Sequence, residues 1–110
     1  MDMILVVCGA GASSTFLASR MRTIVAERGL DLTARAASNL DLGSRLSDAR
    51  VLLVGPHLAS SFAELKAAAA EHSVPAALLP STAFGPTGAL EALELAIGLL
   101  DATPEGSTHA

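Results

Sequence analysis

Four short apolar stretches in this chain alternate with segments whose apolar residues recur at helical spacing. Residues 3–7 (MILVV) and 51–55 (VLLVG) are runs of branched side chains, the second ending in a glycine and the first closely followed by one. Residues 74–80 form a third apolar run, and residues 30–38 alternate in part. The first two runs predict strands that are buried on both faces, and the other two segments predict further strands. We therefore expect four strands, with residues 39–50 as a polar connector that has room for a helical turn.

Three of the remaining segments predict helices. The first spans residues 14–28, with Ser13 or Ser14 as its cap and Gly29 as its stop signal. The second is opened by Pro56, and the third closes the fold. Their apolar positions are, in chain order, Leu17, Met21, Ile24 and Val25, then Leu58, Phe62, Leu65 and Ala69, then Leu90, Leu93, Ile97 and Leu100. Each set lines one face of a helix.

Alternating strands and helices of this length form right-handed βαβ units, so the fold class is α/β with a parallel sheet between helical layers. A chain of 110 residues is long enough for one core. Hydrophobic residues make up 51% and aromatic residues 3%, so that core is aliphatic. We predict a single domain over residues 1–101 and a disordered tail over residues 102–110.

Charge and cysteine content exclude several functions. The net charge of −4, without a basic cluster, disfavours nucleic acid and anionic membranes as partners. No apolar stretch approaches the roughly 20 residues that span a bilayer, and Asp2 stands where a signal peptide carries positive charge. A single cysteine allows neither an intrachain disulfide nor a metal site made of cysteines alone. We expect a cytoplasmic protein without metal or cofactor.

The one cysteine, Cys8, stands where the first strand gives way to a loop of small residues. Ligands bind at the carboxyl ends of strands in parallel sheets, and the loops at residues 55–57 and 81–87 are expected to converge on the same edge. Small side chains let backbone N–H groups approach a ligand, and the start of a helix favours an anion. The sequence therefore predicts a phosphate-binding loop, made of Gly9, Ala10, Gly11, Ala12, Ser13, Ser14 and Thr15.

A helix start also lowers the pKa of a nearby thiol, and the thiolate is the nucleophile. Cys8 is thus a candidate catalytic residue that would carry a phosphoryl group as an S-phosphate. The alternative reading makes Cys8 a small buried residue at the end of a strand and makes Ser13, Ser14 and Thr15 ordinary helix caps. Capping and phosphate binding use the same geometry, so these roles are compatible.

Sharper phosphate motifs do not match this loop. The P-loop of nucleotide hydrolases needs a lysine after its second glycine, and no lysine precedes Lys66. The run GAGASS lacks the third glycine of a dinucleotide-binding loop, and no acidic residue ends the second strand. Cysteine phosphatases end a C-x₅-R loop in arginine, and Ser14 occupies that position. Hydrolysis of a phosphocysteine is therefore disfavoured, as a phosphoryl carrier requires.

The stretch ILVVCGAGASSTFLASRM resembles the opening of the IIB component of bacterial phosphotransferase-system sugar transporters, of the lactose, cellobiose and chitobiose type. The likeness extends to about Asp101. VLLVGPHLASSFAELK is similar to the third strand and proline-led helix of that family, and AFGPTGALEALELA to its last loop and helix.

This resemblance implies a four-stranded parallel sheet of order 2-1-3-4 flanked by helices, of the flavodoxin-like or phosphatase-like kind. It also implies that Cys8 accepts a phosphoryl group from a phosphohistidine of the IIA component. The membrane IIC component then delivers the sugar that receives it. The family commonly has Gln where this chain has His57, Tyr where it has Phe84, and Met where it has Ala12.

Four further side chains have open roles. His57 could act as a donor to the phosphoryl group or be incidental, and Phe84 could cover Cys8 or simply pack. Arg20 and Arg22 fit an ordinary solvated face better than a contact with an acidic partner.

Two other functions remain open on the residues alone. One is a cysteine phosphatase or arsenate-reductase-like hydrolase, which the loop favours and Ser14 opposes. The other is a regulatory domain that binds an anion reversibly without any reaction at Cys8.

Overall fold

The computed structural model describes residues 2–7, 12–38, 42–85 and 87–102. Its four strands are β1 (Asp2–Val7), β2 (Leu32–Ala37), β3 (Val51–Val54) and β4 (Ala76–Leu78). Its α-helices are α1 (Ala12–Arg28), α2 (Leu42–Leu46), α3 (Phe62–Glu71) and α4 (Gly88–Ala102). Two 3-10 helices, η1 (Pro56–Ser61) and η2 (Ser81–Phe84), precede α3 and α4.

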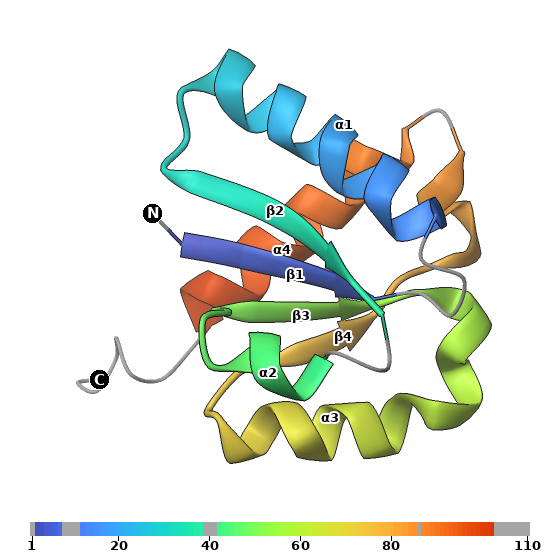
Figure 1. Cartoon of the computed structure of the whole chain (residues 1–110). Helices are drawn as coiled ribbons and strands as arrows, with labels where there is room; N and C mark the ends of the chain where they lie inside the picture. Colours follow the sequence, from blue (N-terminus) through green and yellow to red (C-terminus); the bar gives the residue numbers. More distant parts are fainter. Residues whose placement is uncertain (1, 8–11, 39–41, 86, 103–110) are drawn as a thin grey trace.

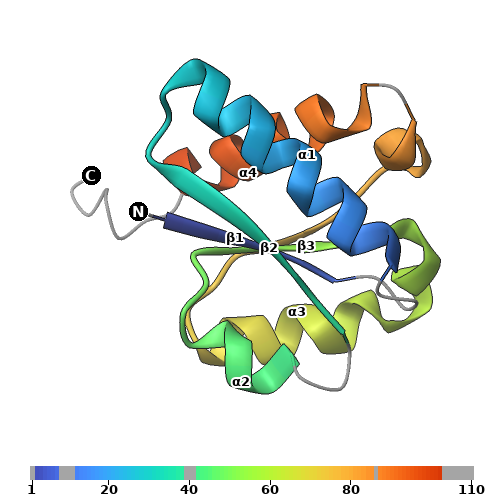
Figure 2. The same ribbon diagram turned by 45° about the horizontal axis from the view of Figure 1, so that its top comes forward.

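The strands form one parallel sheet of order β2-β1-β3-β4, as predicted. Helices α1 and α4 cover one face, and α2 and α3 cover the other, so the molecule has three layers (Figures 1 and 2). In the two central strands, residues 4–7 and 51–54 have no exposed surface. Burial on both faces explains why these runs do not alternate in polarity.

The side chains of the central strands divide between two separate core clusters. Ile4 and Val6 pack with Leu17, Met21 and Leu93 under α1 and α4. Successive side chains of a strand point to opposite faces, so the alternate residues of β1 and β3 reach the other layer. There they pack with Leu42, Leu46 and Ala69 of α2 and α3.

Gly29 ends α1 as the sequence predicts. Its φ of 65° is left-handed, where glycine has no side chain to clash. The Leu30 N–H donates to the Val25 carbonyl at 3.0 Å, and the Gly29 N–H donates to the Ala26 carbonyl at 3.3 Å. This pattern of two bonds is the Schellman stop.

Three predicted boundaries are wrong. The helix expected from residue 14 begins at Ala12, because alanine is a good helix former and the first turn tolerates serine. The helix opened by Pro56 is divided: Leu58 has non-helical φ and ψ of −105° and 22°, so η1 precedes α3. The strand expected over residues 74–80 is only Ala76–Leu78.

The short β4 lies between two prolines. The Val74 N–H donates to the Ala69 carbonyl at 2.9 Å and thereby completes the end of α3 instead of extending the strand. Pro75 has no N–H to donate, although its carbonyl accepts from the Leu52 N–H at 2.9 Å. Pro80 then caps η2. Backbone bonding therefore limits β4 to three residues.

Candidate functional site

The loops that follow β1, β3 and β4 start side by side at the carboxyl edge of the sheet. The Gly55 N–H, just after β3, donates to the Val7 carbonyl at 2.8 Å, and Val7 directly precedes Cys8. The Leu79 N–H, just after β4, donates to the Val54 carbonyl at 2.7 Å. The segments that follow β3 and β4 therefore begin at the edge of the sheet where β1 ends.

The first part of the predicted phosphate-binding loop falls outside the described residues, as does the cysteine before it. Cys8, Gly9, Ala10 and Gly11 lie there, so their roles stay predictions. The rest of the loop, residues 12–15, forms the first turn of α1. Since the helix begins at Ala12, the prediction that Ser13 or Ser14 precedes it as a cap is wrong.

The start of α1 therefore comes directly after the segment that holds Cys8 and the two glycines. The first four N–H groups of a helix have no carbonyl partner within it, and their dipoles favour an anion. The N–H groups of the predicted loop residues 12–15 are those four. Thr15 is exposed within this turn. This backbone can receive a phosphoryl group without any cationic side chain.

The loop before α4 is rich in glycine and proline, yet several hydrogen bonds hold it in place. The Thr82 hydroxyl donates to Glu91 Oε1 at 2.8 Å, and the Thr87 hydroxyl donates to Glu91 Oε2 at 3.1 Å. The Gly85 N–H donates to the Thr82 carbonyl at 2.9 Å. Glu91, in the first turn of α4, thus ties both ends of the loop. The four-residue spacing of Thr87 and Glu91 was the available sequence signal.

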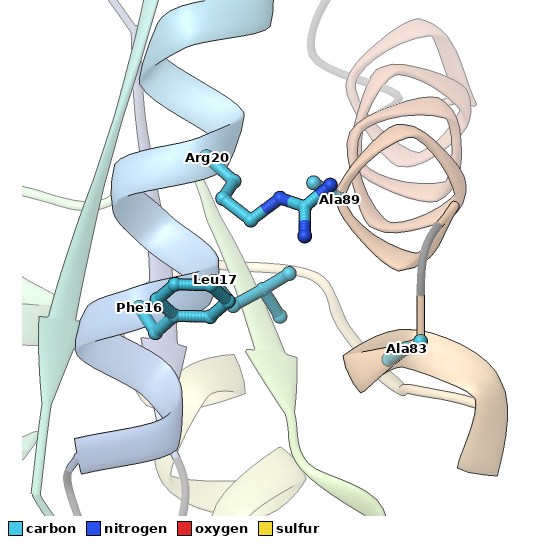
Figure 3. A pocket seen from close by; sticks show the side chains of 6 residues that line it. Phe16, Leu17, Arg20, Ala83 and Ala89 are labelled. Carbon is cyan, nitrogen blue, oxygen red and sulfur yellow. The ribbon is translucent and has the colours of Figure 1, made fainter.

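Phe16 and Arg20 form a pair on α1 that the sequence reading did not identify. The guanidinium carbon of Arg20 lies 5.7 Å from the centre of the Phe16 ring. Both side chains line a small gap between α1 and the η2–α4 segment, together with Leu17, Ala83, Gly85 and Ala89 (Figure 3). The gap has a volume of about 10 Å³. That is room for about one water and not for a sugar.

The sequence predicts an ordinary solvated Arg22, and the residue is exposed, but its side chain also makes a hydrogen bond within the protein. Its Nη1 donates to the Ala34 carbonyl at 2.7 Å and so ties α1 to β2.

His57 is exposed at the start of η1, two residues after Gly55, and its role stays a prediction. The side chain of Phe84 lies outside what the structure describes, so neither expected role is decided.

Within the described residues, no group of three or more His, Cys, Asp or Glu side chains could hold a metal ion. None of the helices in that part of the chain is long and apolar enough to cross a membrane.

Comparison with known proteins gives a family match for this chain. A family model described as "PTS system, Lactose/Cellobiose specific IIB subunit" matches residues 3–85. The search of curated proteins gives no match.

Two solved structures have the same fold. The cellobiose-specific phosphotransferase IIB component protein from Borrelia burgdorferi superposes with a TM-score of 0.75 at 22% identity, covering 93% of this chain and 94% of that chain. The lactose-specific IIB component domain of the phosphoenolpyruvate:carbohydrate phosphotransferase system from Streptococcus pneumoniae gives 0.78 at 14% identity, covering 88% and 95%.

The matched residues include the Cys8 segment and the strands and helices that flank it, and they make up well over half of the chain. The sheet order expected from the resemblance is the observed one. The chain belongs to the lactose/cellobiose-specific IIB family and is thus a sugar phosphotransfer component of the phosphotransferase system.

Proposed function

We propose that this chain is a phosphoryl carrier in sugar uptake and that Cys8 holds the phosphoryl group. One observation carries the proposal: the only cysteine follows the buried central strand β1 and lies just before the start of α1. A thiol at that position has a rigid strand behind it and a helix start in front of it. The IIA component is the proposed donor, and the membrane IIC component is proposed to present the sugar.

In the first step the Cys8 thiolate attacks the phosphorus of a phosphohistidine on the donor. The sulfur–phosphorus bond forms as the nitrogen–phosphorus bond breaks, and the nitrogen keeps the electron pair of that bond. The proton that the thiol lost ends on the imidazole, which leaves neutral. The backbone of residues 9–15 is proposed to stabilise the charge of the transferring group.

In the second step a sugar hydroxyl attacks the same phosphorus. The oxygen–phosphorus bond forms, the sulfur–phosphorus bond breaks, and sulfur leaves as the thiolate that began the cycle. The proton of the hydroxyl is released to solvent. The overall activity is that of a protein-phosphocysteine:sugar phosphotransferase, and we propose the cytoplasm as its setting, since a lone reactive thiol stays reduced there.

The best test is intact-protein mass spectrometry after incubation with phosphoenolpyruvate, the general phosphotransferase proteins and a panel of IIA components. We expect one phosphoryl adduct on the wild type at neutral pH and none on Cys8→Ser. Circular dichroism of Cys8→Ser should match the wild type, because the change replaces sulfur by oxygen and leaves the helices intact.

An adduct that persists in Cys8→Ser would contradict the proposal. Rapid loss of the adduct as inorganic phosphate, without any sugar, would identify a hydrolase instead. Absence of an adduct with every IIA component would favour the anion-binding regulatory domain.

A further inference from the structure

An exposed aromatic side chain lies one turn into α1, directly after the last residue of the predicted phosphate-binding loop. Phe16 is 61% exposed, and it and Leu78 are the large hydrophobic side chains that the described part of the chain exposes. The chain has only three Phe and no Trp or Tyr. Aromatic side chains and arginine are the residues that most often carry the binding energy of a protein interface.

Arg20 holds a cation against this ring. Arg20 follows Phe16 by one turn of α1. Its guanidinium carbon lies over the Phe16 ring, 5.7 Å from the ring centre. Figure 3 shows the Arg20 side chain extending from α1 toward Ala89 at the start of α4. The pair therefore combines an apolar face and a positive charge on one exposed surface.

The residues opposite the pair are small. Ala83, Gly85 and Ala89 lie across the gap, and the gap has room for about one water. A ligand of sugar size cannot enter here, whereas a protein surface can rest on the protruding pair. The surface thus fits a macromolecular partner.

The charges of the two helices in this layer differ in sign. Helix α1 contains Arg20, Arg22 and Arg28 with one acidic residue, Glu27. Helix α4 contains three acidic residues and no basic residue, in a chain of net charge −4. An acidic partner is therefore attracted to α1 and repelled by α4.

We propose that Phe16 and Arg20 dock an acidic surface of the phosphoryl-donor protein beside Cys8. This inference rests on the proposed function. The donor is the occupant, because its phosphoryl group is attached to a protein side chain. Transfer to Cys8 therefore requires a protein surface against the start of α1. Phe16 supplies apolar contact, and Arg20 pairs with a carboxylate of the donor.

The test measures single-turnover phosphoryl transfer from a phosphorylated IIA component over a range of donor concentrations. For Arg20→Glu we expect the half-saturating donor concentration to rise about tenfold at low salt. The maximal rate should stay within about twofold of the wild type, since docking and not chemistry changes. For Phe16→Ala we expect a smaller rise that does not depend on salt.

Two charge reversals on other surfaces are the matched controls. Arg28→Glu makes the same change in net charge at the far end of α1. Lys66→Glu alters the corresponding pair on α3, where the Lys66 ammonium lies 6.0 Å from the Phe62 ring. Both should leave half-saturation within about twofold of the wild type, and iodoacetamide should alkylate Cys8 at the same rate in all variants.

Equal effects of Arg20→Glu and Arg28→Glu would overturn the proposal in favour of overall charge. A fall in maximal rate at unchanged half-saturation would assign the pair to the transfer step. Normal donor kinetics with weakened sugar phosphorylation by membranes would assign this surface to the permease. Wild-type chain that gains no phosphoryl group at all would contradict the proposed function itself.

Discussion

Gly88 marks a close approach of two backbone segments near the candidate site. A Cβ at this position would lie 1.7 Å from the carbonyl oxygen of Ala83 and 2.8 Å from its Cα. Those atoms belong to η2, so no flexible side chain can move aside. The Gly88 N–H also donates to the Gly85 carbonyl at 3.1 Å. The first residue of α4 therefore has to be glycine for the preceding loop to fold back on it.

Substituting Gly88 by alanine should destabilise the protein by about 1–3 kcal/mol, because the added methyl group forces the two backbones apart. Gly98→Ala is the matched control in the same helix, since nothing lies within 4 Å of its Cβ position. That change should stabilise by about 0.5–1 kcal/mol. Urea unfolding followed by circular dichroism measures both, and equal stabilities would contradict the close approach.

Among the elements, η2 is linked to α4 by side-chain hydrogen bonds. Glu91 accepts from Thr82 and Thr87, so one carboxylate holds a loop that is rich in glycine and proline. The same loop provides Ala83 and Gly85 to the surface that faces Phe16 and Arg20. Opening of the loop would therefore alter the proposed docking surface without changing the sheet.

Glu91→Ala should loosen this loop while the rest of the fold persists. The lost bonds are exposed, so we expect a cost of about 0.5–1.5 kcal/mol. Amide hydrogen exchange should become faster at Ala83 and Gly85, whose N–H groups donate to Pro80 and Thr82. Glu94→Ala, one turn later and exposed, is the control. Unchanged protection in Glu91→Ala would show that the backbone alone orders the loop.

Sequence periodicity predicted the strands and helices well, since their apolar residues bury against one sheet. It failed where backbone hydrogen bonding to the end of the preceding helix decides the outcome. Val74 is apolar and β-branched, yet its N–H completes α3, so β4 starts later. The Phe16–Arg20 pair follows from helical spacing, but its neighbours Ala83 and Ala89 follow only from α1 and α4 sharing a face.

On the scale of the whole molecule, the sheet separates two cores that share its central strands. Leu53 belongs to the cluster under α1 and α4, and Leu52 belongs to the cluster under α2 and α3. Both side chains are fully buried. Adjacent residues of one strand thus support opposite layers, and loss of either layer would expose the same strands.

Leu52→Ala and Leu53→Ala should each destabilise the protein by about 2–5 kcal/mol through loss of apolar contact and the cavity left behind. Each variant should still unfold in one transition, because β1 and β3 are shared by the two layers. Circular dichroism in urea gives both the midpoint and the slope. A second transition in either variant would mean that one layer persists without the other.

The two edges of the sheet are poorly suited to pairing with a strand of another molecule. On one side, β4 is three residues long and lies between Pro75 and Pro80. On the other, β2 exposes the charged Arg35. Short strands, prolines and charges at an edge oppose the addition of a strand from another molecule. Encounters with other molecules are thereby directed away from the strand edges and toward side chains on the helices.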